Sequence, residues 1–376
     1  MDKNKRLTVW LPVIIAASIA LGIFIGNHYL SISQGKKRSY SSGNKINAIL
    51  DIIDEQYVDT VSMSKLVEST IPKIFSELDP HSVYIPTEDA SVVNEELEGS
   101  FSGIGVSFNM QTDTILVISV ISGGPAEKAG LLPFDRIISI NDSIFSGKKK
   151  NQGEIMKTLR GAKNSTVKLG VQRGNSPELL YFDVTRGDVP VNSVDVSYEA
   201  AKGIGYIKVS KFARNTYNEF ITAIAKLKQA GCTSFVIDLR GNTGGYMDAA
   251  INMINEFMPE GRLIVYTEGK SFPRSDVYAN GTGTCKDAPI VVLTDEISAS
   301  ASEIFSGAIQ DNDRGTIIGR RTYGKGLVQT QMSLSDGSEM RLTIARYYTP
   351  SGRCIQKKYE MGNTDAYDQD IYNRYM

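Results

Sequence analysis

The feature that most constrains the fold is an alternation of strand-like and helix-like segments in the C-terminal half of the chain. Residues 235–239 form a buried-strand run, a glycine-rich loop follows, and residues 247–258 have helical character. Residues 289–294 form a second such strand and lead directly into a second expected helix, residues 300–310. Repeated strand–loop–helix units indicate an α/β domain, whose chemistry is expected where strands end and helices begin.

Two smaller units precede this α/β domain. In residues 45–98, apolar side chains such as Ile46, Ile49 and Ile53 follow helical spacing, which predicts a small helical region. In residues 99–187, short β-branched runs are separated by Gly, Asn and Pro turns, which predicts a compact β-rich module. A chain of 376 residues is longer than one ordinary domain, so several compact units are expected. The predicted fold class is therefore multidomain α+β.

The first 30 residues predict a membrane anchor. Leu7 to Gly26 is a run of 20 residues without a charge, and a helix of that length spans the roughly 30 Å of a bilayer core. A cleaved signal peptide is the alternative, but the apolar run is longer than the usual signal-peptide core. We expect residues 1–30 to form a cytoplasmic tip and a single transmembrane helix, with residues 31–44 as a flexible tether.

The composition excludes several functional classes. The 41 Lys and Arg residues nearly balance the 42 Asp and Glu residues, so nucleic-acid binding is not expected. Three cysteines and two histidines, without a CxxC or HExxH motif, leave a zinc site without ligands. A histidine-based catalytic triad would have to use His81, which we interpret instead as a structural residue of the turn at residues 78–82.

Ser300 lies where the second strand passes into its helix, in the sequence Ser-Ala-Ser-Ala-Ser-Glu. With Glu303 three residues later it fits a capping box, so it is a candidate helix cap. The same position suits a nucleophile, because the Ala301 N–H is a first-turn donor without an intrahelical partner. That donor and the helix dipole would stabilise an oxyanion. On this stretch alone, both interpretations stay open.

Lys325 lies between Gly324 and Gly326 and is followed by apolar residues. Burial in such a turn disfavours the ammonium form and would lower the lysine pKa from about 10.4 toward roughly 7 or 8, where the amine can accept a serine proton. Gln329 could orient that amine; the alternative is a solvated turn lysine with a polar neighbour. The segment is also one residue short of a P-loop, because Gly326 stands where a Ser or Thr would ligate magnesium.

The β-rich module opens with two glycines immediately before a strand. Such a loop can turn successive backbone N–H groups toward a carboxylate. Its residues are Gly103, Ile104, Gly105 and Val106. Further on, residues 125–137 resemble the helix-and-turn segment of PDZ domains, whose groove binds peptide C-termini by strand addition. Phe134 is a departure, because PDZ domains usually have glycine there.

Together these motifs resemble the carboxyl-terminal processing proteases, also called tail-specific proteases, of peptidase family S41. The resemblance extends from about residue 45 to residue 356. It rests on the segments 78–82 (Leu-Asp-Pro-His-Ser), 238–245 (Asp-Leu-Arg-Gly-Asn-Thr-Gly-Gly), 298–303, 324–329 and 347–353.

The resemblance implies a PDZ domain over residues 99–187 and a crotonase-like α/β protease core over residues 188–356. It implies Ser300 as nucleophile and Lys325 as general base, oriented by Gln329. An oxyanion hole is implied at Gly244, Gly245 and Ala301, without a decision between the two glycine amides. The loop from Gly103 to Val106 would bind the C-terminal tail of a protein substrate. No metal or nucleotide cofactor is then needed, and the expected location is the bacterial inner membrane, with the catalytic part on the periplasmic side.

Two points stay open at this level. Residues 357–376 are polar and tyrosine-rich and depart from the family pattern, so they are assigned to a divergent or shortened tail. The alternative function is a catalytically inactive, membrane-tethered PDZ scaffold that only binds protein C-termini. Oligomeric state and physiological substrate are not indicated.

Overall fold

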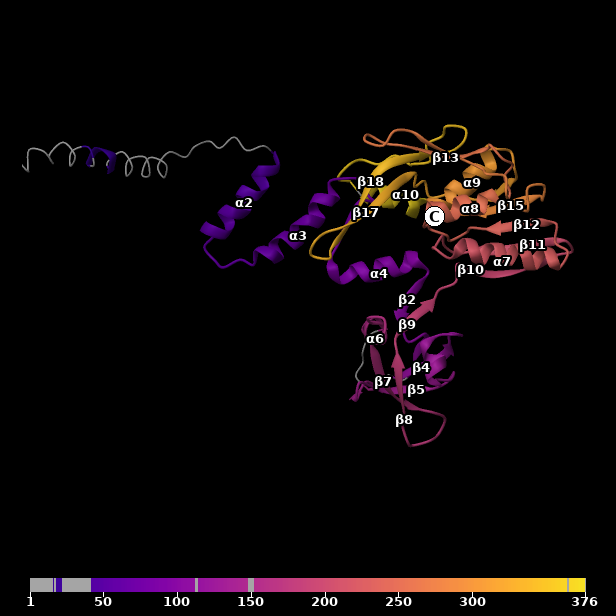
Figure 1. The fold of residues 1–376 in the computed structure, drawn as a ribbon, viewed down its shortest axis with the longest axis horizontal. Helices are drawn as coiled ribbons and strands as arrows, with labels where there is room; N and C mark the ends of the chain where they lie inside the picture. Colours follow the sequence, from indigo (N-terminus) through magenta and orange to yellow (C-terminus); the bar gives the residue numbers. More distant parts are fainter. Residues whose placement is uncertain are drawn as a thin grey trace, which may run out of the picture. The chain divides into compact units, whose positions relative to one another are not determined.

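The computed structural model describes residues 16, 18–21, 42–111, 114–147, 152–363 and 365–375 (Figure 1). It divides into two compact units, residues 1–67 and residues 68–376. Most of the predicted anchor, Leu7 to Gly26, lies outside the described residues. Among the residues that are described, no helix has the length and apolar character needed to cross a membrane. The anchor therefore stays a prediction.

The predicted helical region contains helices α2 (Ser42–Gln56), α3 (Met63–Ser76) and α4 (Thr87–Glu98). Helix α2 begins at Ser42, inside the tether predicted over residues 31–44. Helix α4 ends at Gly99, whose φ of 73° is the left-handed conformation that glycine adopts readily at helix ends. The two helices that apolar spacing predicts in this region correspond to α2 and α3, whereas α4 was not predicted.

The β-rich module is an antiparallel sheet in the order β3-β4-β5-β7-β8, with β6 paired to β5. Its core includes Val117, Ile137, Ile155 and Leu169, all fully buried. The strands and helices of the module are β3 (Val106–Gln111), β4 (Thr114–Val120), α5 (Pro125–Ala129), β5 (Arg136–Ile140), β6 (Ser143–Ile144), α6 (Gln152–Leu159), β7 (Thr166–Gln172) and β8 (Leu180–Thr185).

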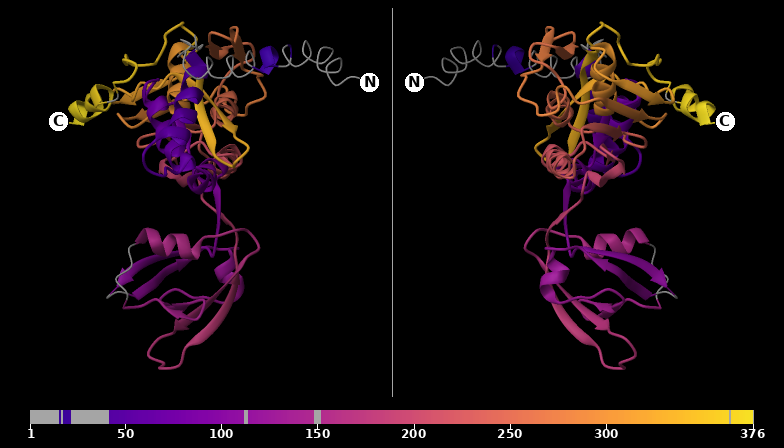
Figure 2. Two further views of the ribbon diagram at one scale, coloured as in Figure 1. Left: turned by 90° about the vertical axis from the view of Figure 1, so that its left-hand side faces the viewer. Right: turned by 90° about the vertical axis from the view of Figure 1, so that its right-hand side faces the viewer.

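The chain enters and leaves this module along paired strands. Strand β2 (Ser100–Gly103) pairs antiparallel with β9 (Gly187–Pro190) (Figure 2). The pairing places Phe101 opposite Val189. The module is therefore an insertion held at its base by a two-stranded ribbon.

The C-terminal half contains the predicted α/β sheet, in the order β10-β11-β12-β15-β16. The pairs β11–β12, β12–β15 and β15–β16 are parallel, and β10–β11 is antiparallel. These strands and the helices that alternate with them are β10 (Val194–Ala201), β11 (Ile204–Val209), α7 (Thr216–Gln229), β12 (Ser234–Asp238), α8 (Met247–Asn255), β15 (Ile290–Thr294), α9 (Ala301–Asp311) and β16 (Thr316–Gly319).

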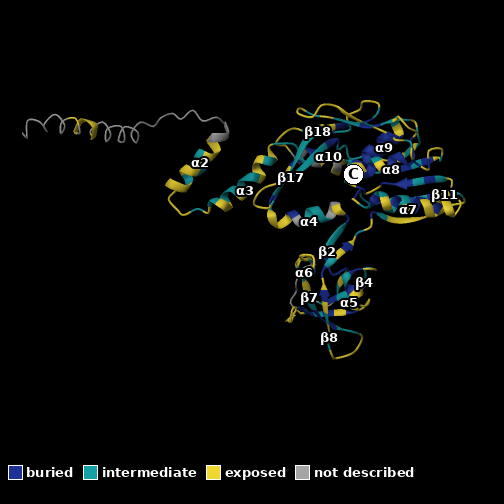
Figure 3. Ribbon diagram, viewed as in Figure 1, coloured by how far each residue is buried: buried dark blue, intermediate teal, exposed yellow. Residues whose placement is uncertain are grey.

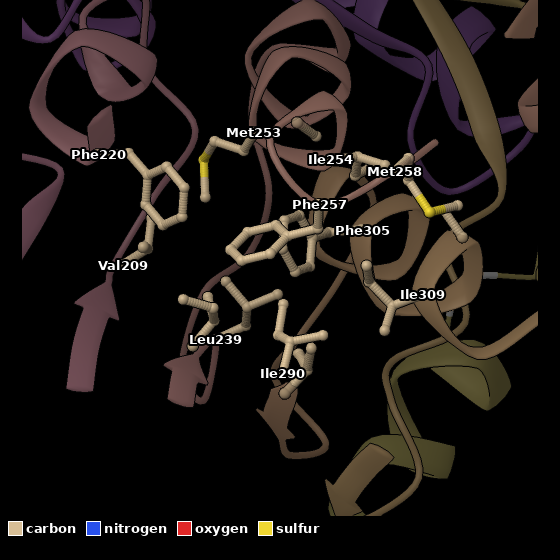
Figure 4. Packing of buried hydrophobic residues seen from close by; sticks show 14 of the residues in the cluster. Val209, Phe220, Leu239, Met253, Ile254, Phe257, Met258, Ile290, Phe305 and Ile309 are labelled. Atoms are coloured by element: carbon tan, nitrogen blue, oxygen red, sulfur yellow. The ribbon is translucent and has the colours of Figure 1, made fainter. Parts of the chain in front are cut away.

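The core of this half lies between the sheet and its helices. Phe257 packs edge-on against Phe220 and Phe305, with ring centroids 6.2 and 6.4 Å apart (Figure 4). It packs in the same way against Phe235, at 6.3 Å. Each fully buried phenylalanine stabilises the fold by about 1.5–3 kcal/mol. Helix α7 is amphipathic and keeps one face exposed, whereas residues 301–309 of α9 are buried throughout (Figure 3). Helix α9 is thus the central helix, and its N-terminus is held firmly in place.

A second, antiparallel sheet completes this half, in the order β1-β18-β13-β14 with β17 also paired to β18. It joins segments far apart in the sequence, because β1 follows the turn at residues 78–82. The strands are β1 (Val83–Ile85), β13 (Leu263–Glu268), β14 (Ser275–Tyr278), β17 (Leu327–Ser333) and β18 (Glu339–Tyr348).

The tail after residue 356 also forms a helix, α10 (Asp365–Tyr375). No helix or strand is expected there from the sequence. Its apolar periodicity is weak, and the contacts that hold it are made by polar and aromatic side chains, described below.

Candidate active site

The three serines of the Ser-Ala-Ser-Ala-Ser motif are not equivalent in the structure. Ser298 and Ser302 are fully buried. The hydroxyl of Ser298 donates to Leu239 O (2.8 Å), and that of Ser302 donates to Asn242 O (2.9 Å). Both therefore tie the turn to the loop that follows β12. Ser300 is partly exposed and lines a pocket, so it is the serine of the three that faces a ligand-sized space.

The backbone of Ser300 has an unusual conformation. Its φ is 55° and its ψ is −114°, at the position that caps the N-terminus of α9. A positive φ is uncommon for a residue other than glycine and costs on the order of 1–3 kcal/mol, and such residues cluster at functional sites. The Ser300 N–H donates to Glu303 Oε2 (2.9 Å). The glutamate half of the predicted capping box is therefore present, and it is compatible with a reactive Ser300.

Glu303 connects the Ser300 turn to the Lys325 turn. Its carboxyl group is buried and accepts the N–H groups of Gly324 (2.7 Å) and Lys325 (2.8 Å) and the hydroxyl of Thr322 (2.7 Å), as well as Ser300 N–H. Burial raises the pKa of Glu303, and the hydrogen bonds from Thr322 and the backbone oppose that rise. From the sequence, only a capping role is expected for Glu303, because nothing local indicates that its carboxyl group also reaches a turn about twenty residues away.

Tyr347 provides a second link between the two turns. Its hydroxyl lies within hydrogen-bond distance of Ser300 O (3.1 Å) and of Lys325 O. The side chain is 2% exposed, and burial raises the pKa of Tyr347, so the phenol stays protonated and donates. The sequence places Tyr347 in a strand motif but gives no sign of this contact.

Lys325 is one of the cationic residues that line the pocket. Its Nζ donates to Gln329 Oε1 (3.0 Å), and Gln329 Nε2 donates to His81 O. Among the described residues Lys325 forms no salt bridge. Burial lowers the pKa of Lys325, and the positive charge of Arg341 lowers it further, against the opposing effects of Asp79 and Glu303. The lysine is thus poised to lose its proton more easily than a solvated lysine.

The glycine-rich loop after β12 packs directly against Ser300. A Cβ placed on Gly244 would lie 2.7 Å from Ala299 O and 2.8 Å from Ser300 Cβ. The loop is held by Asn242, whose Oδ1 accepts the Gly244 N–H (2.8 Å) and whose carbonyl accepts the Ala299 N–H (3.0 Å). Gly244 is therefore required by close approach as well as by its φ of 101°.

Replacing Gly244 with alanine is expected to destabilise the fold far more than replacing Gly231. Gly231 has a similar φ of 94°, but no atom lies within 4 Å of the point that an alanine Cβ would occupy, so alanine there costs about 1–2 kcal/mol of backbone strain. Alanine at Gly244 adds overpacking of about 1–3 kcal/mol against the Ser300 turn. Thermal unfolding of the two variants measures the difference. Equal melting temperatures would show that the loop does not press on Ser300.

The start of the same loop is fixed by Asp238. Its carboxylate accepts the Tyr206 hydroxyl (2.6 Å) and forms an ion pair with Arg240 (2.7 Å). Burial alone would raise the pKa of Asp238, but the hydrogen bonds from Arg240 and Tyr206 outweigh it and lower the pKa to about 2. Asp238 therefore stays ionised and holds the loop over the physiological pH range.

A pocket of about 1070 Å³ gathers six of the predicted site residues. They are Ser300, Lys325, Gln329, Gly244, Gly245 and Ala301. The other predicted group, Gly103 to Val106, does not line this pocket; it runs from the last residue of β2 to the first residue of β3, at the start of the β-rich module. Within the described residues, no group of three or more His, Cys, Asp or Glu side chains is arranged to hold a metal ion.

Two family models match this chain, one over the C-terminal half and one over the β-rich module. Residues 203–365 match the model of peptidase family S41, and residues 102–195 match the PDZ domain model. The "Carboxy-terminal processing protease CtpB" of Bacillus subtilis (strain 168) is 35% identical over 318 residues, covering 84% of this chain and 66% of that protein. A "Probable CtpA-like serine protease" of Staphylococcus aureus (strain N315) is 33% identical over 365 residues, covering 95% of this chain and 72% of that protein.

Among solved structures, one described as "Photosystem II D1 C-terminal processing protease" aligns with 84% of this chain and 91% of its own. The sequence identity is 28% and the TM-score is 0.47.

Proposed function

The chain belongs to the carboxyl-terminal processing proteases of peptidase family S41, and we propose that it is an endopeptidase in which Ser300 and Lys325 form a catalytic dyad. The main observation behind the proposal is the environment of the Lys325 side chain. This lysine is held by an amide rather than by a carboxylate, it has a lowered pKa, and it lines the same pocket as Ser300. A buried amine of this kind can act as the general base for a serine hydroxyl.

In the first step the neutral amine of Lys325 takes the proton from Ser300 Oγ as that oxygen attacks the scissile carbonyl carbon. One C–O bond forms, and the carbonyl π electrons move to its oxygen. Gln329 acts by holding Nζ in place, because its own amide is fixed by the carbonyl of His81. Orientation of this kind removes a large part of the entropic barrier to the reaction.

The resulting oxyanion would be stabilised by backbone donors at the N-terminus of α9. Among the described residues, no acceptor is paired with the N–H groups of Ala301 and Gly245. The Gly244 N–H, in contrast, already donates to Asn242 Oδ1. We therefore assign the oxyanion hole to Ala301 and Gly245, with Gly244 providing the close approach of the loop. The positive end of the α9 dipole adds to the stabilisation.

Collapse of the intermediate breaks the peptide C–N bond, and the Lys325 ammonium gives its proton to the departing amine. Water then attacks the acyl group on Ser300, with Lys325 again taking the proton. Breakdown of the second intermediate releases the new C-terminus and returns the proton to Ser300 Oγ. This chain supplies every proton transfer from its own side chains.

The PDZ domain is proposed to bind the C-terminal tail of the substrate. Strand β3 is an edge strand, paired only with β4 among the described strands, so a peptide can add beside it. In the preceding loop the carbonyls of Ile104 and Gly105 accept N–H groups from Ala126 (2.7 Å) and Ile121 (2.9 Å). Within the described residues, the N–H groups of Ile104 and Gly105 have no acceptor, which suits them to a carboxylate.

A peptide with a free C-terminal carboxylate is expected to bind about 10- to 100-fold more tightly than the same peptide with an amidated end. Hydrogen bonds to a charged acceptor contribute about 1.5–3 kcal/mol, and amidation removes that charge. The measurement is fluorescence anisotropy with the Ser300→Ala protein, so that the probe is not cleaved. Equal affinities for the two peptides would refute carboxylate capture by the loop.

The proposed activity is tested by incubating the protein with a disordered protein that has an apolar C-terminus and mapping the products by mass spectrometry. A protease produces fragments cut near that end. The alternative, an inactive PDZ scaffold, predicts tail binding without fragments. No contact in the described residues favours the scaffold over the protease.

A further inference from the structure

The C-terminal segment has no role in the proposed chemistry, yet it packs against the turn that carries Lys325. Arg374 of α10 donates through Nη1 to Thr322 O (2.7 Å). The Lys357 N–H donates to Gly324 O (2.8 Å). Residues assigned to a divergent tail by the sequence analysis therefore support the backbone on the N-terminal side of Lys325.

Tyr367 of α10 contacts His81 and Gln356. Its side chain is 3% exposed. Its hydroxyl lies 2.8 Å from His81 Nε2 and accepts a hydrogen bond from Gln356 Nε2 (3.2 Å). The ring also packs edge-on against His81, with centroids 5.4 Å apart. A buried hydroxyl with His81, Gln356 and Tyr323 as side-chain partners is fixed in position.

The first partner, His81, is connected by hydrogen bonds to the amine of Lys325. The carbonyl of His81 accepts the Gln329 Nε2–H, and Gln329 Oε1 accepts from Lys325 Nζ (3.0 Å). Any shift of His81 therefore moves the only side-chain acceptor that Lys325 has among the described residues. Tyr367 restrains His81 through the ring nitrogen, while the carbonyl of the same histidine holds Gln329.

The second partner, Gln356, is hydrogen-bonded to the backbone of the turn that carries Lys325. Gln356 Oε1 accepts the Gly326 N–H (2.9 Å), one residue after Lys325. The two amide groups, Gln329 and Gln356, therefore hold the side chain and the backbone of Lys325 separately. The Tyr367 hydroxyl contacts His81, which holds Gln329, and also contacts Gln356 directly.

We propose that Tyr367 is a positioning residue for Lys325, whose hydroxyl fixes the amine through His81 and Gln329 and the adjoining backbone through Gln356. The inference rests on the proposed function of Lys325 as the base. It gives the tail helix α10 a part in catalysis without contact between α10 and the substrate.

The protonation state of His81 agrees with this arrangement. Burial lowers the pKa of His81 to about 4, with the charges of Lys325 and Lys357 lowering it and that of Asp79 opposing them. His81 is therefore neutral at neutral pH, and its Nε2 can accept the single proton of the Tyr367 hydroxyl. That hydroxyl in turn accepts a hydrogen bond from Gln356 Nε2.

The test is Tyr367→Phe in the full chain, which keeps the ring and removes the hydroxyl. We expect kcat to fall about 10- to 100-fold, because misplacing a catalytic group by about 1 Å has an effect of that order. KM and the melting temperature should change little. The acid limb of the pH–rate profile should move to higher pH, since a loosened and better solvated Lys325 binds its proton more tightly. Tyr372→Phe is the matched control, because Tyr372 lies on the same helix and is 61% exposed.

A double-mutant cycle with Gln329→Ala tests whether Tyr367 acts through Gln329. If Tyr367 acts through Gln329, the double variant loses less activity than the product of the two single losses. Losses that multiply, or a Tyr367→Phe enzyme with the kcat and pH profile of the parent, would overturn the inference. The proposed function would survive that result, since it fails only if the parent protein shows no Ser300-dependent cleavage.

Discussion

Ser300→Ala is expected to abolish peptide cleavage, lowering kcat by on the order of 10⁴- to 10⁶-fold, as removal of the nucleophile does in other serine proteases. The substitution removes the one hydroxyl of the Ser-Ala-Ser-Ala-Ser motif that faces the pocket. The flanking hydroxyls cannot replace it, because Ser298 and Ser302 are buried and donate to carbonyls of the glycine-rich loop. Initial rates on a quenched peptide substrate measure the effect.

The matched control is Ser197→Ala, an exposed serine on β10, which should keep full activity. The Ser300→Ala protein should also keep its melting temperature, because the contact with Glu303 is made by the backbone N–H of residue 300 and not by its hydroxyl. Cleavage that persists at more than about a tenth of the parent rate would rule out Ser300 as the nucleophile.

Lys325→Met is expected to lower kcat by a similar factor, because it removes the base and leaves the shape of the side chain largely unchanged. Lys325→Arg should not restore activity, since a guanidinium keeps its proton up to a pH of about 12 or more. In the parent, kcat/KM should rise with pH through the pKa of Lys325. That rise is expected at a pH below the ordinary pKa range of lysine, because burial and Arg341 lower the pKa of Lys325.

The melting temperatures of these variants show whether a loss of activity comes from lost chemistry or from misfolding. The folded-state pKa of Lys325 is below the unfolded value, so the unfolded state binds more protons between the two values and stability rises with pH there. At pH values below that window the folded protein bears the full cost of a buried ammonium. Lys325→Met removes this cost, so its melting temperature at neutral pH should equal or exceed that of the parent. A large fall in melting temperature would mean that lost activity reflects misfolding.

The elements of the catalytic half were predictable because their signals are local. Residues 235–239 and 289–294 form buried parallel strands, and the segment after Ser300 is a helix, as the apolar runs indicated. The β-rich module was likewise predictable from its β-branched runs and turns. Ser300, Lys325 and Gln329 were singled out from short motifs, and the structure brings them to one pocket. The transmembrane anchor and the location at the inner membrane stay predictions.

The supports of the site were not predictable, because each joins segments far apart in the chain. Glu303 fits a capping box locally, and only the folded loop shows that its carboxyl also binds the Lys325 turn. Tyr347 is an ordinary strand residue until β18 places its hydroxyl between two carbonyls. His81 was interpreted as a structural residue of a turn, and its contact with Tyr367 spans 286 residues.

Helix α10 was also not predictable from the sequence. Residues 365–375 have little apolar periodicity, so hydrophobic patterning gives no helix signal. The helix is held instead by Arg374, by the buried Tyr367 and by Lys357, whose ammonium lies 3.8 Å from the centre of the Tyr367 ring. Such polar and aromatic contacts depend on a partner surface that the sequence does not reveal.

The central claim is that Lys325 activates Ser300, and the most direct test is the rate at which a fluorophosphonate probe modifies Ser300 as a function of pH. We expect the parent to be labelled at Ser300, with a rate that rises through the lowered pKa of Lys325, and the Lys325→Met protein to be labelled at a negligible rate. Labelling of Ser300 that is unchanged in Lys325→Met, or labelling at another serine, would contradict the dyad.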